Sequence, residues 1–368
     1  MRVMLNLAYI APGRVGGSEE YAVRLVRAVV ERQPDDIELR IFASRPFFGT
    51  YPDLKALGDA KLSGAASRPL RILSESTALS RGSVDVDVVH HFGGRLPALR
   101  AARPAHVVTV HDLQPVHQPA NFSWVKRRYL NWALPRSVTK AEIVATPSEW
   151  VGESIVDAYG VPPTRVRAVS STWDDDDRVD PALAERFADR RVILYPAVTH
   201  PHKAHDVLIR AVGELARHRS DVVLALPGGE GSAEAAVRRT IESVGASVER
   251  LGRVTAPELR GLLASAGVLA FPSDYEGFGL PVLEAMRAGI PVVAGGAVAV
   301  AEVLGGTGRV VAHPDPSAWA AALDDALNAP AGDVEAARNR AEHYAPANAA
   351  ERLISVWRDA AAHASTTD

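Results

Sequence analysis

Short apolar runs rich in β-branched residues alternate with longer stretches of helical periodicity along the chain. Runs of this kind are typical of strands that are buried on both faces of a parallel sheet. Their alternation with helices predicts repeated β–α–β units, and therefore an α/β fold. In the first half of the chain the predicted strands span 2–9, 37–44, 86–92, 106–113 and 142–148.

The same pattern restarts after an acidic break in the middle of the chain. The second set of predicted strands spans 191–198, 221–228, 247–254, 267–273, 290–296 and 308–312. Because 368 residues exceed the size at which one core usually keeps growing, the restart indicates a second domain.

The break itself gives the domain boundaries. Four successive aspartates, Asp174 to Asp177, repel one another and place the linker near 170–190. We predict domains at 1–172 and 188–345. A last helix near 346–363 closes the chain, and we expect 346–368 to pack back toward the N-terminal domain.

The composition excludes several classes of protein. A net charge of −3 argues against a nucleic-acid partner, and the absence of cysteine excludes disulfides and thiol chemistry. No run approaches the roughly 20 apolar residues of a membrane-spanning helix. Pro12 and Gly13 interrupt the first apolar run too early for a signal peptide, so we expect a cytoplasmic protein.

The densest chemical signal follows the predicted strand 267–273. Gly277 and Gly279 allow a tight loop, Pro281 suits the first position of a helix, and Gly289 suits the position after its end. Glu276 then lies in the loop and Glu284 in the first turns of the helix. Carboxylates bind sugar hydroxyls, and a helix N-terminus favours phosphate, so this segment could bind a sugar phosphate. The alternative explains the spacing equally well: Glu276 is a solvated loop residue, and Glu284 complements the helix dipole.

The segment PSDYEGFGLPVLEA (272–285) resembles the signature of retaining glycosyltransferases of family 4, in which two glutamates flank a GFG loop. The resemblance implies a GT-B fold, with two Rossmann-like domains facing each other across a cleft. It also implies a GDP-, UDP- or dTDP-hexose donor and no obligatory cofactor. By this resemblance Glu276 contacts the transferred sugar and Glu284 the ribose, while the donor is cradled by the backbone of Gly277, Phe278, Gly279 and Leu280.

Lys203 follows the first predicted strand of the second half and resembles the family's phosphate-binding lysine, within a P-H-K-x-H pattern that a subset of relatives carries. Many relatives add an arginine, but the matching positions here are Ala197 and His202, and His202 is the expected partial substitute. Zinc is disfavoured at His200, His202 and His205 because no cysteine ligand adjoins them. Two residues that close predicted strands, Val254 and Ser273, complete the expected donor-binding set.

Two features of the first half suggest further site residues. Gly16 and Gly17 lie in a loop that resembles the family's glycine-rich loop near the donor phosphates and the acceptor, with Ser18 as the expected N-cap. His111 closes the strand 106–113 and resembles a histidine that the family places near the transferred sugar. The alternative for His111 is a hydrogen-bonded residue at a strand end.

The stretch 122–140 mixes tryptophan and tyrosine with lysine and arginine. Such a helix can lie on an anionic membrane surface, and a lipid-linked acceptor would fit that interpretation. The interpretation favoured by general experience is one buried stripe with a solvated charged face. The Asp-x-Asp pairs at Asp85 and Asp87 and within Asp174 to Asp177 are poorly placed for a metal, so none is predicted.

The expected activity is transfer of a hexose, with retention, from a nucleotide sugar to a glycan, lipid-linked or small-molecule hydroxyl, as in a mannosyltransferase-like enzyme. A non-catalytic nucleotide-sugar-binding scaffold of a polysaccharide assembly is the alternative. Ala197 favours the scaffold, whereas Glu276, Glu284 and Lys203 argue for the enzyme. A sugar-nucleotide epimerase or phosphorylase fits the family signature poorly.

Overall fold

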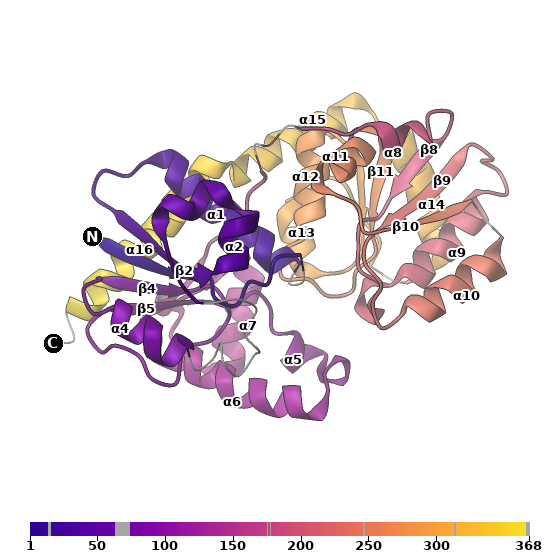
Figure 1. Cartoon of the computed structure of the whole chain (residues 1–368). Coiled ribbons are helices and arrows are strands. Elements are labelled where there is room, and N and C mark those ends of the chain that lie inside the picture. Colours follow the sequence, from indigo (N-terminus) through magenta and orange to yellow (C-terminus); the bar gives the residue numbers. More distant parts are fainter. Residues whose placement is uncertain are drawn as a thin grey trace. The chain divides into compact units, whose positions relative to one another are not determined.

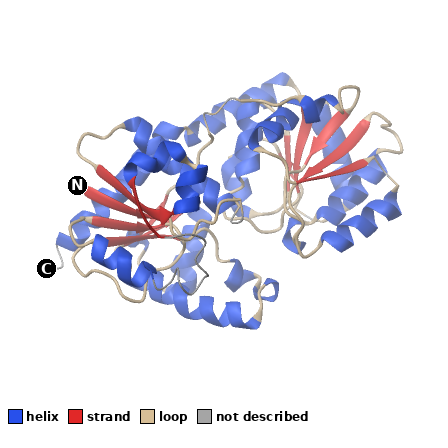
Figure 2. Cartoon of the chain, in the orientation of Figure 1, coloured by secondary structure: helices blue, strands red, loops and turns tan. Residues whose placement is uncertain are grey.

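The chain folds into two compact units, each built on its own parallel sheet (Figures 1 and 2). The computed structural model describes residues 1–13, 16–62, 74–174, 176, 178–245, 247–312 and 314–365. Unit 1 comprises Met1–Thr172 together with the segment from Ala345, and unit 2 comprises Trp173–Tyr344. The α/β fold predicted from the sequence is confirmed.

Seven strands form the sheet of unit 1 in the order β3-β2-β1-β4-β5-β6-β7. Every residue of the three strands β4, β5 and β6 is buried, because helices cover both faces of this part of the sheet. The strands are β1 (Arg2–Asn6), β2 (Glu38–Ser44), β3 (Gly58–Leu62), β4 (Val88–His91), β5 (Ala105–Thr109), β6 (Ile143–Thr146) and β7 (Val166–Ala168).

The last helix, α16 (Pro346–Ser365), belongs to unit 1 although it is the farthest from it in sequence. It packs on α1 (Gly17–Arg32), and its apolar stripe enters the same core as β1. Trp357 is completely buried there. Among the described residues, the other α-helices of the unit are α2 (Arg45–Thr50), α4 (Ser80–Gly82), α5 (Gln114–His117), α6 (Trp124–Lys140) and α7 (Glu149–Tyr159).

Six strands form the sheet of unit 2 in the order β10-β9-β8-β11-β12-β13. They are β8 (Arg191–Leu194), β9 (Val222–Pro227), β10 (Val248–Gly252), β11 (Ala266–Phe271), β12 (Val292–Ala294) and β13 (Arg309–Val310). The helices are α8 (Ala182–Glu185), α9 (His205–Leu215), α10 (Glu234–Val244), α11 (Ala256–Ser265), α12 (Leu280–Ala288), α13 (Val298–Leu304), α14 (Pro316–Leu327) and α15 (Ala331–Ala341).

Two strands of unit 1, β3 and β7, are absent from the sequence prediction. Both lie at the edges of the sheet, and their sequences GDAKL and VRA lack the apolar run that marks an interior strand. The predicted linker contains neither helix nor strand between β7 and α8 among its described residues, and Asp176 is held there by Arg178 and Arg260. Asp175 and Asp177 lie outside the described residues.

Candidate active site

In unit 2 the strand order reverses between β8 and β11. Loops that follow two such strands run in opposite directions and leave a crevice at the carboxyl edge of the sheet, where open α/β sheets bind ligands. The loop after β8 leads to Lys203, and the loop after β11 contains Glu276. The topology therefore places these two predicted residues on either side of one crevice.

Lys203 and Glu276 form an ion pair across this crevice. Lys203 ends the short 3-10 helix Pro201–Lys203, and its Nζ donates to Oε1 of Glu276. The two side chains are only 18% and 14% exposed, so water screens the pair weakly. The arrangement holds one cation and one carboxylate ready for a ligand that carries both anionic and hydroxyl groups.

Hydrogen bonds join the two loops behind this pair. The hydroxyl of the buried Tyr195 donates to the carbonyl of Lys203 (2.8 Å), and it lies 3.0 Å from Oγ of Ser273. The backbone N–H of Asp274 donates to the carbonyl of His202 (2.9 Å). Ser273 is itself fully buried, so it positions the loop from below. The sequence prediction did not include Tyr195. Its place near the end of a predicted buried strand was the one feature that could have marked it as a site residue.

His202 lies half-buried beside Lys203 in the loop after β8. Burial and the neighbouring Lys203 lower the pKa of His202 to about 4, so its ring is neutral at pH 7. The ring stacks on His200, with centroids 5.8 Å apart, while the third histidine of the cluster, His205, is buried beside Tyr195. That His202 partly substitutes for an arginine stays a prediction, in which a neutral ring would donate a hydrogen bond to a phosphate and would bring no charge.

The GFG loop leads directly into α12. Gly279 is its N-cap, with a φ of 108° that favours glycine, and Gly289 ends the helix in the left-handed conformation as predicted. The helix begins at Leu280, so Pro281 is its second residue and not its first. The ring of Phe278 packs against Tyr344, which leaves only backbone at this position to contact a ligand.

The remaining predicted donor residues of unit 2 lie along the same edge of the sheet. Gly277 is half-buried between Glu276 and Phe278, and Glu284 is half-buried in the second turn of α12. Val254 follows the carboxyl end of β10 and is also half-buried.

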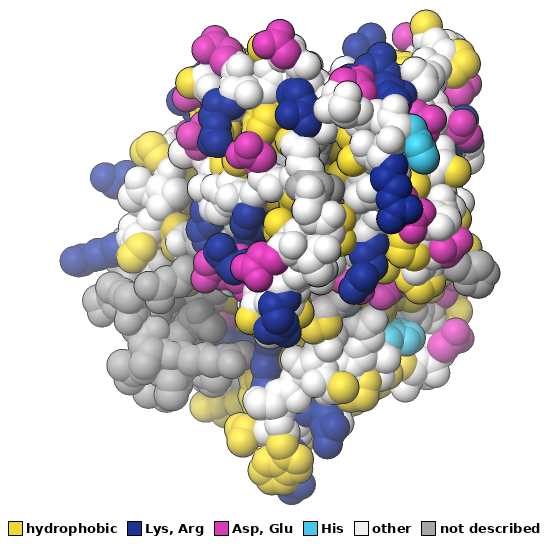
Figure 3. Space-filling model, turned by 90° about the vertical axis from the view of Figure 1, so that its right-hand side faces the viewer, with side chains coloured by type: hydrophobic (Ala, Val, Ile, Leu, Met, Phe, Trp, Pro, Cys, Tyr) yellow, Lys and Arg dark blue, Asp and Glu magenta, His cyan; other side chains and the backbone are white. Residues whose placement is uncertain are grey.

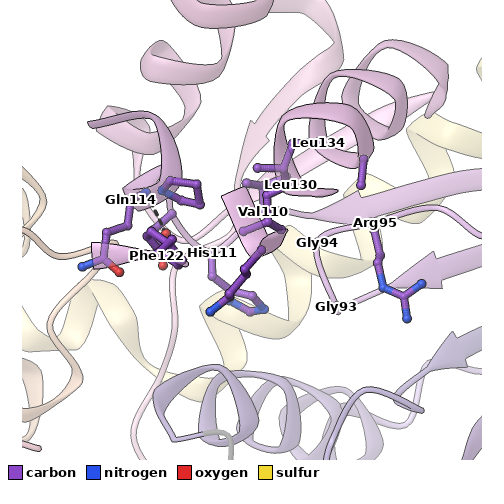
Figure 4. A pocket seen from close by; sticks show the side chains of 13 residues that line it. Gly93, Gly94, Arg95, Val110, His111, Gln114, Phe122, Leu130 and Leu134 are labelled. Carbon is purple, nitrogen blue, oxygen red and sulfur yellow. Dashed lines mark hydrogen bonds between the residues drawn. The ribbon is translucent and has the colours of Figure 1, made fainter. Parts of the chain in front are cut away.

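The other predicted residues belong to unit 1, where a pocket of about 300 Å³ lies beside His111 (Figure 4). The loops after β4 and β5 form two of its walls, and α6 forms a third. Figure 4 shows Gln114 and Phe122 on one side of His111, and the guanidinium of Arg95 pointing away from that histidine. Arg95 pairs with the buried Glu75. The sequence prediction did not include this pocket.

His111 is oriented by the residues around it. Its Nε2 donates to the carbonyl of Phe92 (2.8 Å), and the edge of its ring meets Tyr21 of α1, with centroids 5.1 Å apart. Burial lowers the pKa of His111 to about 4, so Nδ1 is an acceptor at neutral pH. Both the ligand role and the alternative of a hydrogen-bonded strand-end residue fit this geometry.

Gly16 and Gly17 form the start of α1. Gly16 is the N-cap, with a φ of 78°, and Gly17 is the first helical residue, so the expectation that Ser18 caps the helix is wrong. Ser18 instead accepts a hydrogen bond at its carbonyl from the hydroxyl of Tyr9 (2.6 Å). Arg14 and Val15 of the same loop lie outside the described residues.

Three other histidines of unit 1 are buried and take part in two separate sets of hydrogen bonds. The amide of Asn6 donates to Nδ1 of His91 (3.2 Å), Nε2 of His91 donates to Nδ1 of His106 (3.1 Å), and Nε2 of His106 donates to the carbonyl of Ala101 (3.0 Å). In the same way, the indole of Trp357 donates to Nδ1 of His90 (3.1 Å). An added proton would place donors face to face along these chains.

Acidification is expected to destabilise unit 1. Burial is the main cause that lowers the pKa values of His90, His91, His106 and His111, to about 3 for His90 and about 4 for His111. The unfolded chain binds these protons near pH 6.5 and the folded unit does not. Stability is therefore complete above about pH 6.5 and falls as the pH drops toward 4, by about 1.4 kcal/mol per pH unit for each histidine involved.

Urea titrations of the whole chain between pH 7.5 and 4.5 check this expectation. The same titrations of His90→Asn, which removes a buried histidine, and of His218→Asn, which removes an exposed histidine of unit 2, compare the contributions of buried and exposed histidines. A free energy of unfolding that stays constant over this range would contradict the prediction.

Helix α6 exposes its two tryptophans. Trp124, Val125 and Trp132 are 65%, 71% and 58% exposed, and Lys126, Arg127 and Arg128 are exposed between them. Only Ala133, Leu134, Ser137 and Val138 of this helix are buried. The interpretation as one buried stripe therefore holds for the C-terminal half of the helix and is wrong for the aromatic half.

Charges elsewhere are mixed in sign. Figure 3 shows acidic and basic side chains interspersed over the visible face. Within the described ranges, no three His, Cys, Asp or Glu residues are grouped so that they could hold a metal ion. Likewise, no helix in the described part of the chain is long and apolar enough to cross a membrane.

Models of known protein families match both units of the chain. A family model described as Glycosyltransferase Family 4 matches residues 15–176, and one described as Glycosyl transferases group 1 matches residues 190–329. The chain is a GT4-like glycosyltransferase. The two models match the two units, and the second contains Lys203, Glu276 and Glu284.

Two of the similar proteins are mannosyltransferases. The chain is 27% identical to the O-antigen chain mannosyltransferase B of Escherichia coli, over 84% of this chain and 87% of that protein. It is 29% identical to a GDP-mannose-dependent α-(1-6)-phosphatidylinositol monomannoside mannosyltransferase of Mycolicibacterium smegmatis, over 89% and 90%. Both matches extend across most of each protein.

Solved structures confirm the GT-B fold. Anabaena HepE in complex with UDP-glucose superposes with a TM-score of 0.73 at 18% identity, covering 96% of this chain and 98% of that chain. WaaG, a glycosyltransferase involved in lipopolysaccharide biosynthesis, gives 0.69 at 17% identity, covering 96% and 99%. At such identities the likeness concerns the fold alone.

Proposed function

We propose that this glycosyltransferase transfers a hexose from a nucleoside diphosphate sugar to an acceptor hydroxyl, with retention of configuration. The observation that carries the proposal is the Lys203–Glu276 pair at the strand-order reversal of unit 2, beside the N-terminus of α12. The phosphate-binding role of Lys203 follows from this place, because loops that enter helix N-termini favour anions.

The proposed step forms one bond and breaks one bond at the anomeric carbon. The bond to the β-phosphate oxygen breaks, and the acceptor oxygen bonds to the same face of the sugar. The acceptor proton goes to the departing diphosphate. Lys203 and the N–H groups at the start of α12 stabilise the charge that develops on that diphosphate, and Glu276 binds sugar hydroxyls.

The choice of donor is open to direct measurement. GDP-mannose is used by one relative, and UDP-glucose is bound by one structural neighbour, so these two sugars and dTDP-glucose form the first screen. A donor present at about 100 times its dissociation constant stabilises the native state by about 2.7 kcal/mol and raises the melting temperature. Release of GDP or UDP from the stabilising donor then tests transfer. A protein that neither binds nor consumes any of the three would refute the proposal.

We also propose that the acceptor is lipid-linked and binds in the pocket of unit 1 while α6 rests on an anionic membrane at the cytoplasmic face. The pocket is lined by Lys126, Leu130 and Leu134 of α6, and the same helix exposes Trp124 and Val125. Exposed tryptophan beside lysine and arginine is the composition of interfacial helices. A head group would then reach the pocket from the surface on which the helix lies.

Reversing one charge on α6 is expected to weaken membrane binding. Arg127→Glu removes one attraction to anionic lipid and adds one repulsion, so binding to phosphatidylglycerol vesicles is expected to fall about tenfold or more, since each basic residue contributes about 1 kcal/mol. Arg217→Glu, at an exposed position of unit 2, is the control of equal charge change. Equal co-sedimentation of the two variants with phosphatidylglycerol vesicles would contradict the proposed surface. So would wild-type binding to phosphatidylcholine vesicles that is as strong as its binding to phosphatidylglycerol vesicles.

A further inference from the structure

The Lys203–Glu276 pair leaves the charge of a donor incompletely balanced. A nucleoside diphosphate carries at least two negative charges, whereas the charge of Lys203 is already offset by Glu276. His202 is neutral at pH 7, and Ala197 brings no charge to the loop after β8. Backbone N–H groups at a helix N-terminus carry only partial charge, so a further cation on the same edge of the sheet would strengthen the binding of a diphosphate beside this loop.

Two arginines lie near the carboxyl end of β10, and one of them is committed to the fold. Arg250 is 9% exposed and pairs with Glu234 (3.1 Å), and its guanidinium also donates to the carbonyls of Leu226 and Gly229. These bonds fix the loop after β9. Arg253 follows the end of β10 and is exposed to solvent.

Arg253 reaches inward from the edge strand. A Cβ placed on Gly229 would lie 3.1 Å from its Nε and 3.3 Å from its Cζ, so the guanidinium lies against the loop after β9. In the sheet, β9 stands between β10 and β8. Arg253 therefore extends toward the loop that leads to Lys203 and not away from the sheet.

Backbone hydrogen bonds tie the three loops together at this edge. The N–H of Gly228 donates to the carbonyl of Gly252 (2.6 Å), and the N–H of Ala197 donates to the carbonyl of Pro227 (3.0 Å). A side chain on Gly228 would lie 2.1 Å from the carbonyl oxygen of Ala197. The loops are thus packed without intervening side chains, which brings Arg253 and the loop of Ala197 to the same part of the edge.

We infer that Arg253 binds the diphosphate of the nucleotide donor, as the cation that complements Lys203. The inference rests on the proposed function, and it assigns to a residue after β10 the charge that the loop after β8 lacks. Arginine suits this role because its planar group donates two parallel hydrogen bonds to phosphate oxygens.

Calorimetric titration of the full chain with GDP, UDP, dTDP and the corresponding free nucleosides tests this assignment. For the diphosphate that binds the wild type, Arg253→Ala is expected to raise the dissociation constant about 10- to 100-fold, because a hydrogen bond to a charged group is lost. Arg253→Lys is expected to restore part of this loss. The affinity for the free nucleoside is expected to change less than about twofold.

The control is Arg186→Ala, which removes an exposed arginine that pairs with Glu249 at the amino end of β10. Unchanged diphosphate affinity in Arg253→Ala, or an equal loss for the nucleoside, would overturn the assignment while the proposed function stands. A wild-type protein that binds none of GDP, UDP and dTDP would overturn both. Melting temperatures without ligand show whether each variant is folded.

Discussion

Glu276→Gln is expected to lower turnover by at least about 10²–10³-fold while the protein remains folded. Glutamine preserves the shape of the side chain and can still accept a hydrogen bond from Lys203. It removes the carboxylate charge that offsets the lysine and that, in the proposed mechanism, lies beside the sugar. Losses of this size follow when one preorganised electrostatic contact to a transition state is removed.

The matched control is Asp274→Asn, in the same loop two residues earlier. Asp274 is exposed, and its link to the neighbouring loop uses its backbone N–H, which the substitution keeps. Rates of nucleoside diphosphate release from the stabilising donor, measured with saturating acceptor, compare the two variants. Wild-type turnover in Glu276→Gln would remove this residue from the proposed mechanism, and so would an equal loss in Asp274→Asn.

Trp357→Ala is expected to produce the largest loss of stability in unit 1, about 3–5 kcal/mol. The substitution leaves a cavity where a fully buried indole contacts the core that contains α1 and β1, and it removes the donor to Nδ1 of His90. For a unit of this size the loss corresponds to a fall of roughly 10 °C in its melting temperature.

Two further variants separate packing from hydrogen bonding at this position. Trp357→Phe keeps most of the apolar contact but leaves Nδ1 of His90 without its donor, so an intermediate melting temperature is expected. Trp124→Ala removes an equally large side chain that is 65% exposed, and it should melt close to the wild type. If Trp357→Ala melts like Trp124→Ala, α16 does not stabilise the unit as its burial indicates.

The α/β fold could be predicted because its signals are local. Apolar β-branched runs mark the interior strands, and the glycines at 277, 279 and 289 mark the loop and the two ends of α12. The edge strands β3 and β7 could not be predicted, because a strand with a neighbour on only one side needs less apolar sequence. Ser18 was chosen as a cap from residue type alone, whereas the chain turns into α1 at Gly16.

The candidate site could be predicted only in part. The motif around Glu276 identified the chemistry, but the pairing of Lys203 with Glu276, 73 residues apart, depends on the strand order. The charge of His202 depends on burial that no short segment reveals. The exposure of Trp124 and Trp132 could not be read from helical periodicity, because aromatic and basic residues occur on the same part of α6.

By itself the amino-acid sequence determined the succession of strands and helices and the loop that presents Glu276, since backbone preferences and apolar periodicity act over a few residues. Only the tertiary structure decided which distant side chains meet, which histidines are neutral and which face of α6 is exposed. Those properties arise from burial and from contacts between segments remote in the chain, and a change of strand order would alter all of them without changing any local pattern.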